Sequence, residues 1–290
     1  MIRLATRSSP QARKQAEVVA QAITDSTAGE QVVLVFVETL GDQHADIPLH
    51  TIGGQGVFVK EVQQAVLSGN ADIAVHSAKD LPSQPTTGLV VGAWCERRDA
   101  RDALIGSRLD DLARGATVAT GSVRRRKQLS SLRPDLQFID LRGNIHKRLD
   151  KIPDGGAIVM AVAALQVLDL TERITEILDP KIVVPMIGQG CVAVECRADD
   201  RGVQEILRLI DHPRTRWRVE IERTFLAELG AGCNMPVGAY VDDGDVLTTY
   251  LASSSEAGGT AVIFSELLSY IFDPYQRAAE LARKSRDALS

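Results

Sequence analysis

The side chains best suited to chemistry in this sequence follow predicted strands, where the chain turns into a helix or a loop. In open α/β sheets, ligands bind beyond the carboxyl ends of the strands, so polar residues there are candidate binding residues. The set contains cations, hydroxyls, one amide and one carboxylate: Arg7, Ser9, Ser77, Lys79, Asp80, Thr120, Ser122, Arg124, Arg125, Arg142, Asn144 and Arg148. Guanidinium groups bind carboxylates or phosphates in a two-pronged way, and helix starts add backbone N–H donors. The set therefore predicts an anionic ligand.

The charge distribution supports this prediction. Residues 124–151 hold nine Lys or Arg and three Asp, within a chain whose net charge is −5. Two other interpretations of the basic run 124–127 stay open, namely a solvated helix face and a nucleic-acid patch. The run is short, aromatic residues make up 4% of the chain and the net charge is negative, which disfavours nucleic acid. We expect a small anion with several carboxylates, and no nucleic acid.

Asp80 and His76 are the titratable residues at the end of the predicted strand 72–77. Asp80 is a candidate for proton transfer or for binding N–H groups, although a lone Asp before Leu81-Pro82 is by default a turn residue. A lone strand histidine such as His76 is more often a core residue than a catalyst. The spacing of His and Cys predicts no metal site, and the sequence has neither a P-loop nor a G-x-G-x-x-G motif.

The four cysteines divide into two kinds of position. Cys95, Cys191 and Cys196 are predicted to be small core residues, because free cysteines are among the most buried residue types. Cys233 differs because it lies in a glycine-rich turn, Gly-Ala-Gly-Cys-Asn, between a predicted helix and a predicted strand. This is where an exposed, usable thiol is expected.

Alternating strands and helices must position these residues. Strands are predicted at 2–6, 31–39 and 72–77, and in a second series at 116–120, 137–141 and 157–160. Helices between them predict parallel βαβ units with helices on the faces of two sheets. The chain is predicted to return through strands at 182–185 and 191–197. From about residue 213, a helix, a hairpin around 242–245, a third strand and a final helix predict a small α+β domain.

The 290 residues allow two or three domains. We predict an α/β protein with two doubly wound α/β lobes, resembling two-lobed anion-binding proteins, plus a small α+β C-terminal domain. Lobe 1 comprises residues 1–95 and 191–212, lobe 2 comprises 96–190, and domain 3 comprises 213–290. The longest apolar run, 157–165, is far shorter than the roughly 20 residues of a membrane helix. Since the N-terminus also lacks the apolar core of a secretion signal, we expect a cytoplasmic protein without membrane contact.

Five segments resemble motifs of the porphobilinogen deaminase (hydroxymethylbilane synthase) family, in the family's order. They are 5–10 (ATRSSP), 72–82 (DIAVHSAKDLP), 141–149 (LRGNIHKRL), 188–190 (GQG) and 230–239 (GAGCNMPVGA). The last segment resembles the loop to which the family attaches its cofactor. Because each motif is specific and the five span most of the chain, the sequence is identified by resemblance as a member of this family.

The resemblance implies a transferase of porphyrin and haem biosynthesis. Such an enzyme joins four molecules of its substrate, porphobilinogen, head to tail on a dipyrromethane primer, releases ammonia, and then hydrolyses off hydroxymethylbilane. The implied cofactor is dipyrromethane, held covalently by a thioether to Cys233. Asp80 is the implied catalytic residue, because a carboxylate there can hold pyrrole N–H groups, stabilise positive charge and help protons to move. The implied protein is a monomer.

The resemblance also implies which residues line the binding cleft. The implied cofactor-binding residues are Cys233, Ser77, Lys79, Asp80, Thr120, Ser122, Arg124, Arg125, Arg142 and Asn144. The implied substrate-binding residues are Arg7, Ser9, Gln15, Phe58, Arg142, Arg148 and Gln189. No metal is implied.

Several positions differ from many family members. Thr51 and Gln55 stand where lysines are common, Ala164 where glycine is usual and Val167 where arginine is usual. Gln11 and Arg13 replace apolar residues, and Asn234-Met235 replaces a more usual Ser-Ala. The alternative to an enzyme is a non-catalytic, two-lobed anion-binding protein. Such a protein explains the arginines but has no use for an exposed Gly-Cys loop.

Overall fold

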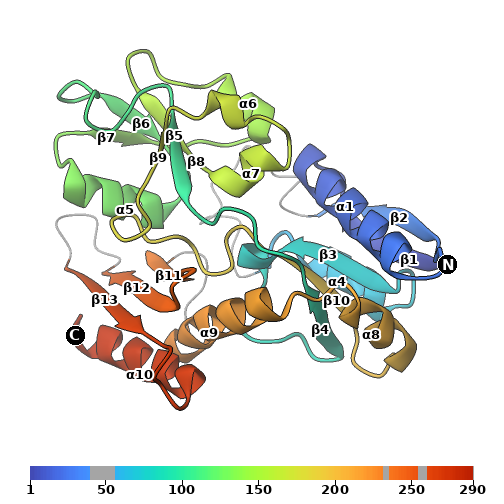
Figure 1. Cartoon of the computed structure of the whole chain (residues 1–290). Coiled ribbons are helices and arrows are strands. Elements are labelled where there is room, and N and C mark those ends of the chain that lie inside the picture. The colour runs from blue at the N-terminus through green and yellow to red at the C-terminus, as the bar shows by residue number, and fades with distance from the viewer. Residues whose placement is uncertain (40–55, 231–234, 254–259, 290) are drawn as a thin grey trace. The chain divides into compact units, whose positions relative to one another are not determined.

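The computed structural model of the chain describes residues 1–39, 56–230, 235–253 and 260–289 (Figure 1). The chain forms two compact units. Unit 1 comprises residues 1–98 and 191–217, and unit 2 comprises residues 99–190 and 218–290. The described residues form two five-stranded sheets and a smaller three-stranded sheet with helices around them, which confirms the predicted fold class.

The sheet of unit 1 has the strand order β2-β1-β3-β10-β4. Its strands are β1 (Ile2–Arg7), β2 (Val32–Val37), β3 (Ile73–Ser77), β4 (Leu89–Trp94) and β10 (Val192–Arg197). Strands β2, β1 and β3 are parallel, whereas β10 runs antiparallel to both of its neighbours. The helices of this unit are α1 (Pro10–Ser26), α4 (Lys60–Leu67) and α8 (Arg201–Arg208).

Side-chain alternation along the buried strands explains why helices cover both faces of this sheet. Leu4 and Val75 belong to a core cluster that also includes α1 and α8. Their sequence neighbours Ala5 and Ala74 belong to a second cluster with α4. Because successive side chains of a strand point to opposite faces, an unbroken apolar strand requires a helix on each side. This is the doubly wound arrangement that the sequence predicts.

Unit 2 repeats the pattern with the strand order β7-β6-β8-β5-β9. Its strands are β5 (Asp102–Ile105), β6 (Thr117–Ala119), β7 (Gln137–Ile139), β8 (Ala157–Ala161) and β9 (Glu176–Ile177). Its helices are α5 (Val123–Leu132), α6 (Ile145–Leu149), α7 (Val162–Gln166) and the 3-10 helix η2 (Thr171–Arg173). Leu129 of α5 packs on one face, and Ile145 of α6 and Leu165 of α7 pack on the other.

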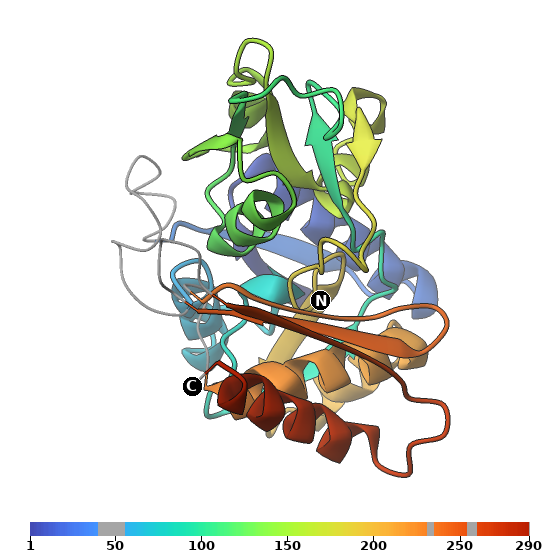
Figure 2. The same cartoon turned by 90° about the vertical axis from the view of Figure 1, so that its left-hand side faces the viewer.

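The third sheet is an antiparallel meander in the second half of unit 2. It contains β11 (Val237–Val241), β12 (Val246–Ala252) and β13 (Ala261–Leu267). Helix α10 (Pro274–Asp287) packs along β12 and β13, as Figures 1 and 2 both show. Helix α9 (Pro213–Leu229) precedes this sheet, and the boundary between the two units falls within it. The three-domain division stays a prediction.

The segment 182–185, predicted to be a strand, is not one. Val184 is fully buried, as its apolar surroundings in the sequence suggest. Its backbone groups, however, are bonded by side chains of α5: its N–H donates to Gln128 Oε1 at 2.7 Å, and its carbonyl accepts from Arg124 at 2.6 Å. An apolar run therefore predicted burial correctly but not the hydrogen-bonding partner, because side chains can replace a neighbouring strand.

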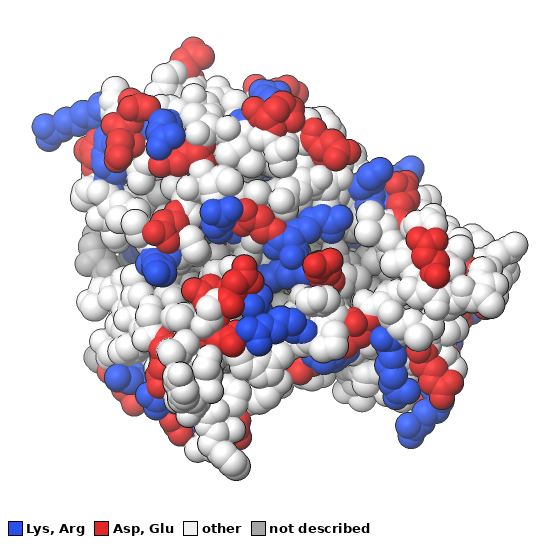
Figure 3. Space-filling model, in the orientation of Figure 1, with Lys and Arg blue, Asp and Glu red and all other residues white. Residues whose placement is uncertain are grey.

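In the described part of the chain, none of the helices has both the length and the apolar character needed to cross a membrane. Within the same residues, no group of three or more His, Cys, Asp or Glu side chains is arranged to hold a metal ion. On the face shown in Figure 3, Lys and Arg side chains are interspersed with Asp and Glu.

Candidate functional site

The candidate catalytic aspartate lies directly after strand β3. The strand ends at Ser77, and the chain then forms the short 3-10 helix η1 (Ala78–Asp80). The first amide of η1 donates to the carbonyl of Cys191 at 2.9 Å, and Ser77 Oγ donates to Gln15 Oε1 of α1 at 3.2 Å. The start of β10 and helix α1 therefore both hold this turn. They leave the side chain of Asp80 half-buried at the carboxyl end of a parallel strand.

Arg7 and Phe58 meet near the same edge of the unit 1 sheet. Arg7 is the last residue of β1, and its guanidinium carbon lies 4.1 Å from the centre of the Phe58 ring, within the range of a cation–π contact. Ser9 caps α1 by accepting from the amide of Ala12 at 3.4 Å. Because β1 and β3 are parallel neighbours, Arg7 and Ser77 emerge at one edge. Unit 1 thus brings Arg7 into contact with Phe58 and places Arg7 and Ser77 at one edge of its sheet.

In unit 2, the predicted hydroxyl and amide residues fix the starts of two helices. Ser122 Oγ accepts from the amide of Arg125 at 3.4 Å and caps α5, and Thr120 Oγ1 accepts from the amide of Ser122 at 3.3 Å. Asn144 Oδ1 caps α6 by accepting from the amide of Lys147 at 3.0 Å. Caps of this kind satisfy N–H groups that have no partner inside the helix. They also set the direction of the basic side chains in each first turn.

The two turns that follow β6 and β7 pack against each other. A Cβ atom on Gly121 would lie 2.9 Å from the carbonyl oxygen of Leu141 and 3.8 Å from Cδ of Arg142. Glycine therefore allows the turn before α5 to approach the turn before α6. Arg148 of α6 donates through Nε to the carbonyl of Gly143 at 2.7 Å. Arg142 and Arg148 are consequently attached to the same edge of this sheet as Ser122.

Arg124, Arg125 and Gln189 converge on Asp102, the first residue of β5. Arg124 donates to Asp102 Oδ2 at 2.7 Å. Arg125 donates to Oδ1 through Nε at 3.1 Å and Nη2 at 2.7 Å, and Gln189 Nε2 donates to the same oxygen at 2.8 Å. All four side chains are buried. A buried carboxylate is stable only when it is paired and hydrogen-bonded in this manner.

The electrostatics of this cluster keep Asp102 ionised. Burial raises the pKa of Asp102, but the charges of Arg124 and Arg125 and the hydrogen bonds outweigh burial and hold that pKa well below its ordinary value. Burial lowers the pKa of Arg124, and the charge of Asp102 opposes this change. Asp102 was not among the predicted site residues. No pattern in the sequence marks it, because it is one of three carboxylates in the charged stretch 96–102.

Two family models match this chain and together cover most of it. A model described as porphobilinogen deaminase, dipyrromethane cofactor binding domain, matches residues 2–205, and a model of the porphobilinogen deaminase C-terminal domain matches residues 217–253. The chain belongs to the porphobilinogen deaminase family. This family consists of transferase-type enzymes of porphyrin biosynthesis that bind porphobilinogen, and its cofactor is dipyrromethane.

Several solved structures are similar to this member of the porphobilinogen deaminase family. A TRAP periplasmic solute binding protein from Desulfovibrio salexigens is 15% identical, with 74% of this chain and 73% of that chain covered and a TM-score of 0.45. A YaeC family lipoprotein from Enterococcus faecalis is 13% identical, with 74% and 93% covered and a TM-score of 0.43. The family assignment rests on the two family models.

Some predicted positions of this porphobilinogen deaminase family member lie outside the described residues, namely Cys233, Thr51 and Gln55. Ala164 and Val167, two of the departures named in the sequence analysis, lie in and just after α7. Both are buried, with exposures of 6% and 4%. The side chain of Val167 is therefore part of the packed interior of unit 2.

Proposed function

We propose that this chain catalyses the stepwise head-to-tail condensation of four porphobilinogen molecules onto a dipyrromethane primer, with release of ammonia, and then the hydrolysis of the product to hydroxymethylbilane. The observation that carries the proposal is the setting of Asp80. It is a half-buried carboxylate at the carboxyl end of β3, on a sheet edge that also presents Arg7 and Ser77. A substrate with acidic side chains and N–H groups needs both cations and a carboxylate acceptor.

The roles proposed for unit 1 follow from this chemistry. Asp80 accepts N–H groups of the pyrrole rings, stabilises positive charge that develops when ammonia leaves, and helps move the proton. Arg7 pairs with a substrate carboxylate, and its contact with the ring of Phe58 holds both side chains at the edge. Ser9, Gln15 and the remaining polar residues of η1 complete the polar lining.

The roles proposed for unit 2 concern the cofactor. The dipyrromethane supplies the pyrrole terminus on which the oligopyrrole grows. It carries carboxylates, which fit the guanidinium-rich helix starts of unit 2. We propose that Cys233 holds it through a thioether, and that Arg142 and Arg148 pair with acidic side chains of the cofactor or of the substrate. Asn144 caps α6, the helix that carries Arg148.

The activity is tested with purified protein and porphobilinogen. We expect ammonia release and, after oxidation, a uroporphyrin-type absorption spectrum. Asp80→Asn should retain the cofactor mass yet lose at least a hundredfold in turnover, because the amide cannot carry the negative charge that the step requires. Asp111→Asn makes the same chemical change at an exposed position and should turn over normally. Near-normal turnover by Asp80→Asn removes Asp80 from the mechanism.

The attachment is tested by intact mass. The purified protein should exceed its polypeptide mass by two pyrrole units and give colour with Ehrlich's reagent. Cys233→Ser should abolish both signals, whereas Cys95→Ser, a matched change at a half-buried cysteine, should leave them. Carboxylate binding without either signal in the unchanged protein would favour the non-catalytic anion-binding protein instead. The monomer predicted from the sequence is checked on the same sample by light scattering.

A further inference from the structure

A buried polar cluster lies beneath helix α4, on the sheet whose strand β3 leads to Asp80. It consists of Gln63 of α4, His76 of β3, Glu195 of β10 and Thr86 of the loop before β4, and is here called the Glu195 cluster. His76 is 5% exposed, and Gln63 and Glu195 are each 4% exposed. None of the roles proposed above uses these side chains, although polar groups buried in this way must be held by partners.

Alternation along two strands places His76 and Glu195 on the α4 face of the sheet. Ala74 belongs to the core cluster that contains residues of α4, and His76 is two residues further along β3. Glu195 lies opposite Ala74 in the antiparallel pairing of β10 with β3. Because residues two apart in a strand share a face, both polar side chains lie beneath α4, which packs on β3 and β10 (Figure 1).

One carboxylate oxygen of Glu195 holds the cluster together. Its Oε2 accepts from Gln63 Nε2 at 2.7 Å, and His76 Nε2 lies 3.1 Å from the same oxygen. The second contact is a close approach rather than an aligned hydrogen bond. At the other end of the Gln63 amide, Oε1 accepts from Thr86 Oγ1 at 3.1 Å. The contacts therefore run from β3 through β10 and α4 to the loop at residue 86.

The two ends of the Glu195 cluster enclose the segment that carries Asp80. His76 precedes Asp80 on β3, and Thr86 follows it in the loop that leads to β4. A three-residue 3-10 helix such as η1 is too short to hold a side chain by its own hydrogen bonds. The position of Asp80 therefore depends on the chain on either side of η1, and the cluster ties both sides to one carboxylate.

We infer that Glu195 is a positioning residue for Asp80. Its carboxylate fixes β3 and the loop at Thr86 against α4, and so holds the Asp80 carboxylate where it can accept pyrrole N–H groups. Because Glu195 is buried, it acts through Asp80 and not on the ligand itself. The inference rests on the proposed function for the reaction that Asp80 serves, and it goes beyond it because no residue of the Glu195 cluster is among the predicted site residues.

The first test measures ammonia release from porphobilinogen by Glu195→Ala, at a temperature well below its unfolding midpoint. Intact mass should show the dipyrromethane in place. KM should stay within about threefold and kcat should fall by roughly tenfold or more, because a small misplacement of a reacting group is costly. Glu195→Gln keeps an oxygen that accepts from Gln63 and should recover kcat to within about threefold of the unchanged protein.

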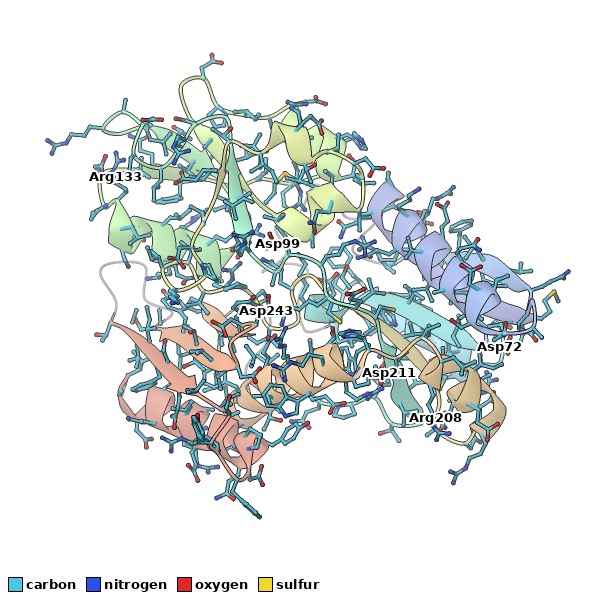
Figure 4. The ribbon with its side chains drawn as sticks, in the orientation of Figure 1. Asp72, Asp99, Arg133, Arg208, Asp211 and Asp243 are labelled. Carbon is cyan, nitrogen blue, oxygen red and sulfur yellow. The ribbon has the colours of Figure 1, made fainter. Side chains whose placement is uncertain are left out.

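Asp72→Asn is the matched control for this test. Asp72 is also a carboxylate that anchors β3 through hydrogen bonds, but it lies at the opposite end of the strand (Figure 4 labels Asp72). Its replacement should lower stability and leave kcat unchanged. An equal loss of kcat in Asp72→Asn and Glu195→Ala would show a general effect of a weakened strand, and it would overturn the inference.

The second test is a double-mutant cycle with Asp80→Asn. A residue that acts through the Asp80 carboxylate has nothing left to position in that background, so Glu195→Ala should slow the remaining turnover by less than about twofold. Gln63→Met removes the bonds to Glu195 and Thr86 with an unbranched side chain, and it replaces Glu195→Ala in the cycle if that variant does not fold. Effects that multiply with Asp80→Asn in the folded variant overturn the inference.

Failure of this inference is distinguishable from failure of the proposed function. Hydrogen exchange of the backbone amides of residues 77–88, followed by peptide mass, reports on the anchoring without substrate. Glu195→Ala should speed this exchange by roughly tenfold or more, whereas Asp72→Asn should leave it within about twofold. That result supports the anchoring even if the unchanged protein never releases ammonia, in which case only the proposed function is wrong. Equal exchange in the two variants refutes the anchoring.

Discussion

Asp72 offers a test of how the strand that carries Asp80 is anchored at its other end. Asp72 directly precedes β3 and accepts from Arg3 at three donors: the amide at 2.9 Å, Nε at 3.1 Å and Nη2 at 2.7 Å. Arg197 at the end of β10 donates to it at 3.4 Å. The labelled position of Asp72 in Figure 4 shows it at the α8 end of this unit. Asp72→Asn keeps the shape of the side chain and removes the charge.

The size of the effect follows from the pKa of Asp72. Hydrogen bonds from Arg3, opposed by burial, lower that pKa from its ordinary 3.8 to about 2. At about 1.36 kcal/mol for each pKa unit, this difference sets a ceiling of roughly 2.4 kcal/mol. The side chains of Asp72 and Arg3 are 17% and 40% exposed, so water screens part of the interaction. We expect Asp72→Asn to lower the free energy of unfolding by about 1–1.5 kcal/mol at neutral pH.

The pH dependence distinguishes charge from packing. A carboxyl group whose pKa is depressed by folding stabilises the protein above its unfolded pKa, and this stabilisation is lost as the pH falls through the folded pKa. The stability difference between the unchanged protein and Asp72→Asn should therefore be constant from about pH 7 to 5, shrink below about pH 4 and vanish near about pH 2. Urea unfolding, followed through the fluorescence of the buried Trp94 in the same unit, measures it. A difference at pH 3 equal to that at pH 7 would refute the reasoning, and Asp111→Asn is the exposed control.

Three further predictions concern packing, thiols and a helix cap. Gly156→Ala should destabilise by about 1–3 kcal/mol, measured by urea unfolding, because its Cβ would lie 2.1 Å from the carbonyl oxygen of Thr117. Burial raises the pKa of both Cys95 and Cys196 to about 11. At pH 8, iodoacetamide should therefore modify them on the order of a hundredfold more slowly than free cysteine, and peptide mass mapping will reveal any rapid labelling that contradicts this. Asp273→Ala should cost about 1 kcal/mol, seen as a lower urea midpoint, because Asp273 caps α10 through two amides; an unchanged midpoint would show the cap to be dispensable.

The parts of the site that the sequence predicted well depend on local signals. The apolar strand before Ser77 and the positions of Ser9, Ser122 and Asn144 just after predicted strands are each encoded within a few consecutive residues. Rules for strand burial, capping and strand ends therefore apply directly. The structure has all three residues capping helices, and it ends the buried strand at Ser77, with η1 and Asp80 directly after it.

The parts that the sequence did not predict depend on contacts between distant residues. Asp102 meets Arg124 across 22 positions and Gln189 across 87. Nothing in the charged stretch before Asp102 distinguishes the one carboxylate that becomes fully buried. The segment at Val184 was wrongly predicted to be a strand for the same reason, since its hydrogen-bonding partners are side chains 56 and 60 positions away. Hydrophobic periodicity predicts which face of a helix or strand is buried. It does not predict which distant polar side chain will form hydrogen bonds there.

Topology explains why Asp102 and η1 both lie at the carboxyl edge of a set of parallel strands. Strands β5 and β10 are each the first strand that the chain forms after passing from one unit into the other. Each runs antiparallel to a neighbour from the parallel set, with Asp102 opposite Ala161 of β8 and Val192 opposite Ser77 of β3. The first residue of an entering strand must therefore lie at the carboxyl edge of the parallel strands. A polar residue placed there can hold neighbouring cationic side chains, as Asp102 holds Arg124 and Arg125, without interrupting the apolar core beneath.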